Sequence, residues 1–463
     1  MDMLPAARSV CEDALALARL QRDGRAWAVL AWPSALEANP IAAFTAARGR
    51  RRTLLWNEGE WMLGVGDAAA VASDGPGRTA HLTAAAARLD CRCAIAVHGG
   101  DATIAAQLPC LFTALSFEDH APGPSHWGNG LSGARMWLPR RLLWRRADGS
   151  GWIVAALGLT GGDQSPGRLA ERLIADPTPV MAGMPATWPS LKTDYQERVE
   201  DVVSLIRDGA MRKVVLARAV DETLSSSVDE ASVLTRLHAQ GGAETTVYAH
   251  DVDDGSLFVG ASPELLFSAE GNRVVAMALA GSSPRATDPA EDQRLIDALM
   301  ASTKERKEHG VVVEHLVSIL RPRCHGFAIP PAPHPRLLNR LLHLETLLEA
   351  DLRQPDYLEL LQALHPTPAV CGLPTPTAAN YIARHEHLHR GLYTGALGWT
   401  TPQSCRFIVP LRGAILRDAS MTADKRAGIA RLFAGAGIVE TSDPAAEFAE
   451  TELKFEIMRS ALQ

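Results

Sequence analysis

The sequence predicts an α+β fold whose strands are mostly antiparallel. Strand-like segments occur in pairs joined by short turns, as in residues 51–66, which turn near Asn57–Gly59. Residues 141–159 form a second such pair, with its turn at Asp148–Gly151. Helical patterns instead occur in blocks, and they do not alternate regularly with the strands as they would around a parallel sheet.

The elements follow in order along the chain. Residues 1–175 mix short helical and strand-like patterns, and the Pro-rich segment 174–190 reads as a connection. Beyond it, residues 195–209 place apolar side chains on one helical face, and Gly209 can end that helix. Residues 213–220 then predict a strand, because they are apolar and rich in valine.

The next segments continue this arrangement. Residues 256–282 predict three strands, divided by a Ser-Pro break and by a turn at Glu270–Asn272. A long helical stretch starts at Asp288–Pro289 and runs toward Leu320. Residues 407–416 predict one more strand.

Composition excludes several classes of protein. The 463 residues, 47% of them hydrophobic and 21% charged, are ordinary for a globular chain, and length alone favours two or three domains. A net charge of −7 argues against nucleic acid as the main partner. Seven irregularly spaced cysteines do not form a disulfide framework. Because we find neither a signal peptide nor a membrane-spanning run, we expect a soluble cytoplasmic protein with no membrane partner.

Two short segments carry paired carboxylates. Residues 435–456 combine a Gly-Ala-Gly loop with a helix that Asp443 can cap and whose first position suits Pro444. Three residues separate Glu447 from Glu450 in this helix, so both lie on one face.

Another helix repeats this spacing. Glu305 and Glu308 lie three residues apart within the helical segment 302–316. Two helices that each offer such a pair can meet across a cleft, where carboxylates and water suit a hard cation such as Mg²⁺. Exposed helix faces carry the same pattern, so the spacing alone leaves a solvated surface as the alternative.

The order of motifs along the chain carries a family resemblance. The motifs read KVVLAR, GASPELLF, ALAGSSPRATD, KERKEH, LLHLETLLEADL, LHPTPAVCGLP, GLYTGALGW, FIVPLRGAIL and GAGIVETSDPAAEFAETELK. Together they resemble the chorismate-utilising enzymes, a family that includes isochorismate, salicylate, anthranilate and aminodeoxychorismate synthases. The resemblance implies a single large domain of two mostly antiparallel sheets flanked by helices. Residues 1–190 would then be a structural part of this fold, and residues 191–463 the catalytic, chorismate-binding region.

The resemblance also implies the roles of the acidic residues. Glu308 and Glu450 match Mg²⁺ ligands, and Glu305 and Glu447 match their partners, which act directly or through water. The ion would receive one carboxylate of chorismate, which is a dianion.

A second group of residues matches the part of the site that binds anions and the ring. Arg412 matches a carboxylate-binding arginine, and Tyr393 matches its hydroxyl partner. The other matching positions are Gly281, Ser282, His343, Gly435, Gly437 and Lys454. The glycines would let backbone N–H groups approach the substrate, and Lys454 would be a charge partner of Glu450 on the same helical face.

The choice of nucleophile separates the members of this family. Water-using members carry a lysine where ammonia-using members commonly carry glutamine, and this chain has Lys213 there. Desolvation on an apolar strand can lower the pKa of Lys213 toward that of a usable base. Glu264 matches the acid that protonates the leaving 4-hydroxyl, and its apolar neighbours can raise its pKa.

These matches imply an isomerase, an isochorismate synthase that adds water at C2 of chorismate without an obligatory glutaminase subunit. The alternative is a salicylate synthase, which would go on to release salicylate and pyruvate. The sequence LAGS around Gly281 favours the first, because salicylate synthases tend to read LAGT. An ammonia-using subunit and a catalytically silent chorismate-binding protein are further alternatives. The product could serve menaquinone or siderophore biosynthesis, and the long N-terminal half favours the menaquinone type.

Overall fold

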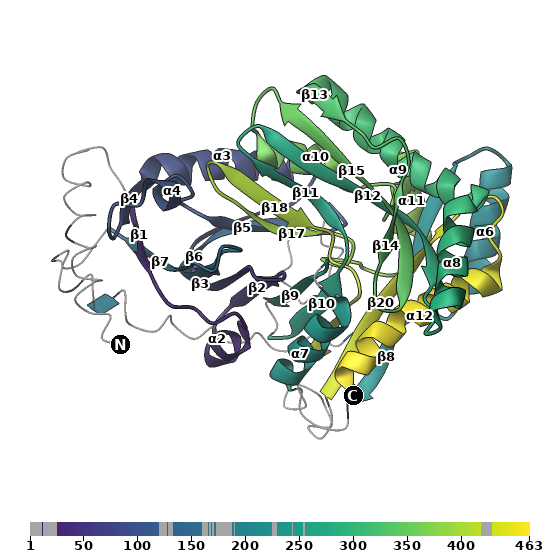
Figure 1. Cartoon of the computed structure of the whole chain (residues 1–463), viewed down its shortest axis with the longest axis horizontal. Helices are drawn as coiled ribbons and strands as arrows, with labels where there is room; N and C mark the ends of the chain where they lie inside the picture. Colours follow the sequence, from purple (N-terminus) through teal and green to yellow (C-terminus); the bar gives the residue numbers. More distant parts are fainter. Residues whose placement is uncertain are drawn as a thin grey trace.

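The computed structural model describes residues 26–119, 133–159, 190–224, 229–242, 244–252, 255–417 and 428–463, together with residues 12, 127, 165, 168, 171, 172 and 188. Most of the segment before residue 26 lies outside these residues, and so does most of the predicted connection 174–190. Within them, the protein is a single domain of helices around a large and mainly antiparallel sheet, as predicted (Figure 1). The helices of this part of the chain are all too short or too polar to cross a membrane.

The N-terminal half supplies the first strands of the sheet. Its strands are β1 (Trp27–Pro33), β2 (Arg52–Trp56), β3 (Trp61–Ser73), β4 (Cys93–Val97), β5 (Leu111–Leu115), β6 (Ala134–Arg145) and β7 (Gly151–Gly158). Its helices are α2 (Ile41–Ala46), α3 (Arg78–Arg92) and α4 (Ala102–Ala105). Both predicted hairpins are confirmed, because β2 pairs with β3 and β6 pairs with β7, each in antiparallel register.

The C-terminal half supplies the longer strands and most of the helices. Its strands are β8 (Lys213–Leu224), β9 (Thr246–Asp251), β10 (Leu257–Ser262), β11 (Leu265–Glu270), β12 (Arg273–Pro284), β13 (Cys324–Ala328), β14 (His334–Leu337), β15 (Leu341–Leu352), β16 (Gly372–Leu373), β17 (Ala396–Thr400), β18 (Ser404–Ile408), β19 (Gly413–Arg417) and β20 (Gly428–Ile438). Its helices are α6 (Tyr195–Arg207), α7 (Glu230–Gly241), α8 (Pro289–Ala301), α9 (Thr303–Leu320), the 3₁₀ turn η1 (Arg321–Arg323), α10 (Tyr357–Leu364), α11 (Thr375–His385) and α12 (Pro444–Leu462).

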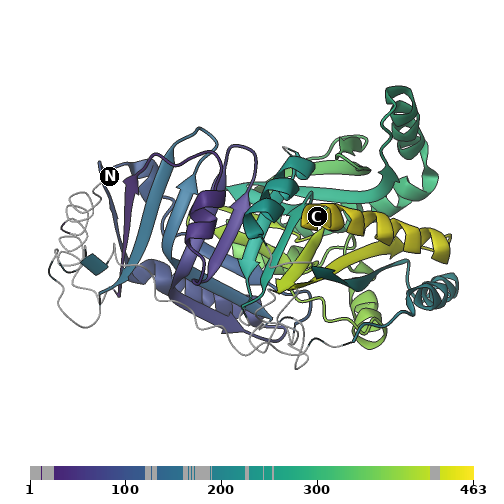
Figure 2. The same ribbon diagram turned by 90° about the horizontal axis from the view of Figure 1, so that it is seen from below.

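Two ladders join the halves. Strand β2 pairs with β9, and β5 pairs with β17, so the N-terminal strands lie hydrogen-bonded beside C-terminal ones. All described strands therefore form one connected network, where we expected two sheets. Figure 2 shows the halves at opposite ends of one continuous body.

Two predicted elements are interrupted in the structure. The helical stretch from Asp288 to Leu320 is divided at Ser302, whose backbone is extended and whose hydroxyl caps α9 by accepting from the N–H of Glu305 at 3.3 Å. The predicted strand 407–416 is divided into β18 and β19 by the segment 409–412. Arg412, the last residue of this segment, has φ +49°, in the left-handed region.

The two glutamate-bearing helices are fixed to the sheet by their later turns. Helix α9 packs on β12 and β15 through buried residues that include Val312 and Leu316, and α12 packs along β20 through residues that include Phe455 (Figure 1). Asp443 caps α12 as predicted, since its carboxylate accepts from the N–H of Ala446 at 2.8 Å. The first turns of both helices are thereby held in fixed positions.

Candidate active site

One cavity brings together side chains from both of these helices and from the strands beside them. Its empty volume is about 610 Å³, which includes open solvent at the mouth. The predicted residues that line it are Glu264, Gly281, Ser282, Glu305, Glu308, His343, Arg412, Gly435, Gly437, Glu447, Glu450 and Lys454. The described residues of segment 1–190 contribute none of the lining, since all of it comes from positions 215 to 454.

The two predicted glutamate pairs meet in this cavity, and lysines lie among them. Nζ of Lys304 lies 3.4 Å from Oε1 of Glu447 and 3.8 Å from Oε1 of Glu305, so it bridges α9 and α12. One helical turn after Glu450, Nζ of Lys454 lies 2.5 Å from its Oε1, as the spacing predicts.

The glutamates repel one another. Burial raises the pKa of Glu305, and the neighbouring Glu308 and Glu450 raise it further. Burial likewise raises the pKa of Glu447, with added repulsion from Glu450 and Glu308. Hard carboxylate oxygens that repel one another fit a divalent cation such as Mg²⁺, because the cation would offset the repulsion.

In the structure, the side chains of these glutamates are not arranged as a complete set of metal ligands. Among the residues that the structure describes, no group of three or more His, Cys, Asp or Glu side chains is arranged to hold a metal ion. Magnesium binding at these residues therefore stays a prediction.

Lys213 lies beneath the cavity floor, where β8 begins. Its side chain is only 1% exposed, and its Nζ lies 2.8 Å from Oε1 of Glu308. Gly437 on the neighbouring strand β20 makes room for this contact. A Cβ at that position would lie 2.9 Å from Cε of Lys213 and would overlap the Glu308 carboxylate.

Glu264 is placed in the wall by the break between β10 and β11. Its backbone N–H donates to the hydroxyl of Ser262 at 3.2 Å, and its carbonyl accepts from the N–H of Val409 at 3.1 Å. Burial raises the pKa of the Glu264 carboxyl to about 8, although Lys213 and Arg412 oppose the shift. This confirms the predicted direction, and a carboxyl with this pKa is largely protonated at neutral pH.

Arg412 and His343 form a hydrogen-bonded chain along another wall. Burial, together with the positive charge of Arg412, holds the pKa of His343 well below its usual range, so the ring is neutral. Nδ1 of His343 lies 3.1 Å from the carbonyl oxygen of Gly281, so this nitrogen carries the proton and donates. Nε2 then accepts from Nη2 of Arg412 at 3.2 Å.

Gly281 and Ser282 of β12 line the cavity beside Glu305 of α9. Gly281 has φ +76°, a conformation that favours glycine, and a Cβ there would lie 3.1 Å from Oε2 of Glu305. The N–H of Ser282 donates to the same oxygen at 3.3 Å. The backbone of β12 thus approaches the acidic pair closely.

Tyr393 lies under the cavity rather than on its surface. It is buried, stacks on Phe433 with a centroid distance of 5.2 Å, and its hydroxyl would lie 3.4 Å from a Cβ at Gly435. The carbonyl of Gly435 accepts from Nζ of Lys454 at 2.7 Å. Of the predicted binding residues, Tyr393 is the one that does not line the cavity.

Several lining residues were not predicted from the sequence. Lys304 is the charged one, and the apolar ones are Val215, Pro263, Leu279, Ala280, Ala369 and Leu411. The scarcity of lysine was a usable signal for Lys304, because the chain has only six lysines and three of them, Lys213, Lys304 and Lys454, gather around these glutamates.

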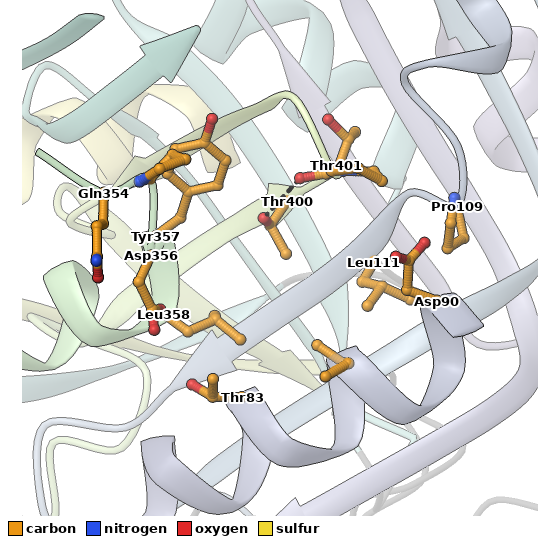
Figure 3. A pocket seen from close by; sticks show the side chains of 14 residues that line it. Thr83, Asp90, Pro109, Leu111, Gln354, Asp356, Tyr357, Leu358, Thr400 and Thr401 are labelled. Carbon is orange, nitrogen blue, oxygen red and sulfur yellow. Dashed lines mark hydrogen bonds between the residues drawn. The ribbon is translucent and has the colours of Figure 1, made fainter. Parts of the chain in front are cut away.

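A second cavity lies between α3 and the segments around residues 354–358 and 400–402 (Figure 3). The described residues that line it include Asp90 and Asp356 but no lysine, arginine or histidine. A dianion would meet only negative charge there. The glutamate-bearing cavity, which has Arg412 and Lys454 in its walls, is therefore the better candidate for an anionic substrate.

A family model described as "chorismate binding enzyme" matches residues 16–463. The chain belongs to this family. Among its curated relatives, the isochorismate synthase DhbC of Bacillus subtilis (strain 168) is 37% identical over 278 residues, which cover 58% of this chain and 67% of that protein. The isochorismate synthase EntC of Escherichia coli (strain K12) is 35% identical over 269 residues, covering 58% of this chain and 66% of that protein.

Solved structures of the chorismate-binding enzymes extend the match to the N-terminal half. The menaquinone-specific isochorismate synthase MenF of Escherichia coli superposes with a TM-score of 0.75 at 25% identity, covering 98% of this chain and 99% of that one. Anthranilate synthase component I of Streptococcus pneumoniae TIGR4 has a TM-score of 0.57 at 20% identity, covers 76% of this chain and 80% of that one, and shares the fold.

Proposed function

We propose that this chorismate-binding enzyme is an isochorismate synthase, an isomerase that adds water at C2 of chorismate while the 4-hydroxyl leaves. The observation that carries the proposal is one cavity whose walls hold Glu264, Arg412 and the four glutamates, with Lys213 buried behind the wall and paired with Glu308. The identity to DhbC and EntC, whose names give this activity, supports it.

Substrate binding follows from charge. Chorismate carries two carboxylates, and Arg412 can meet one of them with its planar set of N–H donors. Nε2 of His343 accepts a hydrogen bond from one of these N–H groups and so restricts the guanidinium to one orientation. Gly435 and Gly437 have no Cβ, so an anion can closely approach their backbone N–H groups.

Glu264 is suited to protonate the leaving hydroxyl. With a pKa of about 8, it holds a proton at neutral pH and can give it to the 4-oxygen as the C–O bond breaks. Burial of the side chain is the main cause of this raised pKa.

Lys213 is proposed to take a proton from the attacking water. In the structure, its ammonium is paired with Glu308, so the amine must give up a proton before it can act as a base. Ammonia needs no such base, so Lys213 favours water as the nucleophile, and no glutaminase subunit is required.

Mg²⁺ would be held by Glu308 and Glu450, with Glu305 and Glu447 as partners. When bound, the ion would supply positive charge for a substrate carboxylate, which the glutamates alone would repel. The N-terminal half is proposed to have a structural role, consistent with the absence of its described residues from the cavity lining.

The proposal is tested by incubating the purified protein with chorismate and Mg²⁺ and identifying the products by chromatography. Isochorismate is the expected product. Salicylate together with pyruvate would instead indicate a salicylate synthase, and unchanged chorismate would refute both activities.

A further inference from the structure

The acidic cavity already contains its own counter-ions. Glu305, Glu308, Glu447 and Glu450 carry up to four negative charges, and Lys213, Lys304, Lys454 and Arg412 carry four positive ones. Each glutamate has a lysine nitrogen within 3.8 Å. A divalent cation that enters such a balanced cluster adds charge, so its binding is most favourable if one lysine can move away.

The three lysines differ in how firmly they are held. Lys213 is 1% exposed and lies 2.8 Å from Glu308, within the packed floor. Lys454 is 12% exposed, and its Nζ has two short contacts, at 2.5 Å to Glu450 and 2.7 Å to the carbonyl of Gly435. Moving either one away would leave its glutamate carboxylate unpaired, and Lys454 would also lose its bond to the carbonyl of Gly435.

Lys304 is held most weakly. Its side chain is 40% exposed, and its contacts with Glu447 and Glu305 are the longest of the set, at 3.4 and 3.8 Å. It lies at the first turn of α9, from which its flexible stem can swing into water. A partly exposed pair of this kind is weak, so the ammonium is easily displaced.

We propose that Lys304 is a displaceable counter-ion, which neutralises the facing glutamates of α9 and α12 before the metal binds and is expelled to solvent when the metal enters. The inference rests on the proposed function, because it takes the glutamates as the metal site. It assigns to Lys304 a role in setting metal affinity, and no part in the proton transfers.

Metal binding tests this role directly. Titration of the substrate-free protein with Mn²⁺, followed by electron paramagnetic resonance, should show tighter binding to Lys304→Met than to wild type, by about tenfold or more, because a nearby positive charge has been removed. Lys304→Arg keeps the charge and should remain near wild type. Lys307→Met is the matched control, since Lys307 is exposed three residues further along α9. Equal Mn²⁺ affinity in all four proteins, or weaker binding to Lys304→Met, would overturn the inference.

Chemical labelling supplies a readout that does not depend on a variant. Reductive methylation of wild type, followed by peptide mass spectrometry, should modify Lys304 faster when Mg²⁺ is present, while Lys307 should react at an unchanged rate. No change at Lys304 at saturating Mg²⁺ would contradict displacement. If the inference fails while chorismate is still converted to isochorismate, the proposed function stands; if no metal binds and no product forms, both fail.

Discussion

Nη2 of Arg412 donates to Nε2 of His343 at 3.2 Å, and the opposite ring nitrogen donates to the carbonyl of Gly281 at 3.1 Å. These two hydrogen bonds connect Arg412, whose backbone is in the left-handed region between β18 and β19, to the backbone of β12. Because the imidazole is neutral and hydrogen-bonded on both sides, it holds the guanidinium without competing for an anion.

Arg412→Lys should therefore weaken substrate binding more than it slows turnover. Lysine keeps the charge but loses the planar donor set and the bond to His343, so we expect KM for chorismate to rise by about tenfold or more. Steady-state kinetics measure both constants. An unchanged KM would mean that Arg412 does not contact the substrate.

Glu264→Gln should lose about 100- to 10,000-fold in kcat, because the amide cannot give up a proton. In wild type, the active form has a protonated Glu264, so kcat should fall as the pH rises through about 8. This group should cause no loss on the acid side of that value. A pH profile that stays flat between pH 6 and about 9, or a Gln variant with near-wild-type kcat, would remove Glu264 from the role of acid.

Removal of the metal should abolish turnover and leave the fold intact. Excess chelator should stop isochorismate formation, and added Mg²⁺ should restore it. Glu308→Ala and Glu450→Ala should each lose activity while far-ultraviolet circular dichroism stays unchanged, since both side chains line the cavity. Full activity in chelator would show that the glutamates serve another purpose.

Gly437→Ala should inactivate the enzyme through a single methyl group. The new Cβ would overlap the Glu308 carboxylate and press on Cε of Lys213, so both side chains must shift. Gly310→Ala is the matched control, because a Cβ at this position in α9 meets nothing within 4 Å. The control should keep its activity and gain about 0.5–1 kcal/mol in the free energy of unfolding, measured with urea. Equal activity in both variants would contradict the close packing proposed around Lys213.

Local rules were enough to predict the α12 cap at Asp443 and the one-turn contact between Glu450 and Lys454, because both depend on near neighbours in the sequence. The break at Ser302 was missed because a serine within a helical pattern is a weak signal. Pro410 inside the run 407–416 was a usable signal for the interrupted strand, since proline is rare in central strands.

Long-range contacts were beyond single-sequence reasoning. The pairing of β2 with β9, which joins the expected two sheets, links residues nearly two hundred positions apart. The bridge from Lys304 to Glu447 likewise depends on how two helices pack. The resemblance predicted which residues gather at the cavity, but the contacts of Lys213 and Lys304 with the glutamates came from the structure.

The source of the oxygen at C2 tests the central claim most directly. Wild type and Lys213→Gln are incubated with chorismate and Mg²⁺ in water labelled with oxygen-18, and the products are analysed by mass spectrometry. Wild type should form isochorismate with one labelled oxygen at C2, because the attacking group is solvent water, and Lys213→Gln should form little of it. Isochorismate without the label, or labelled product from Lys213→Gln at the wild-type rate, would contradict the account.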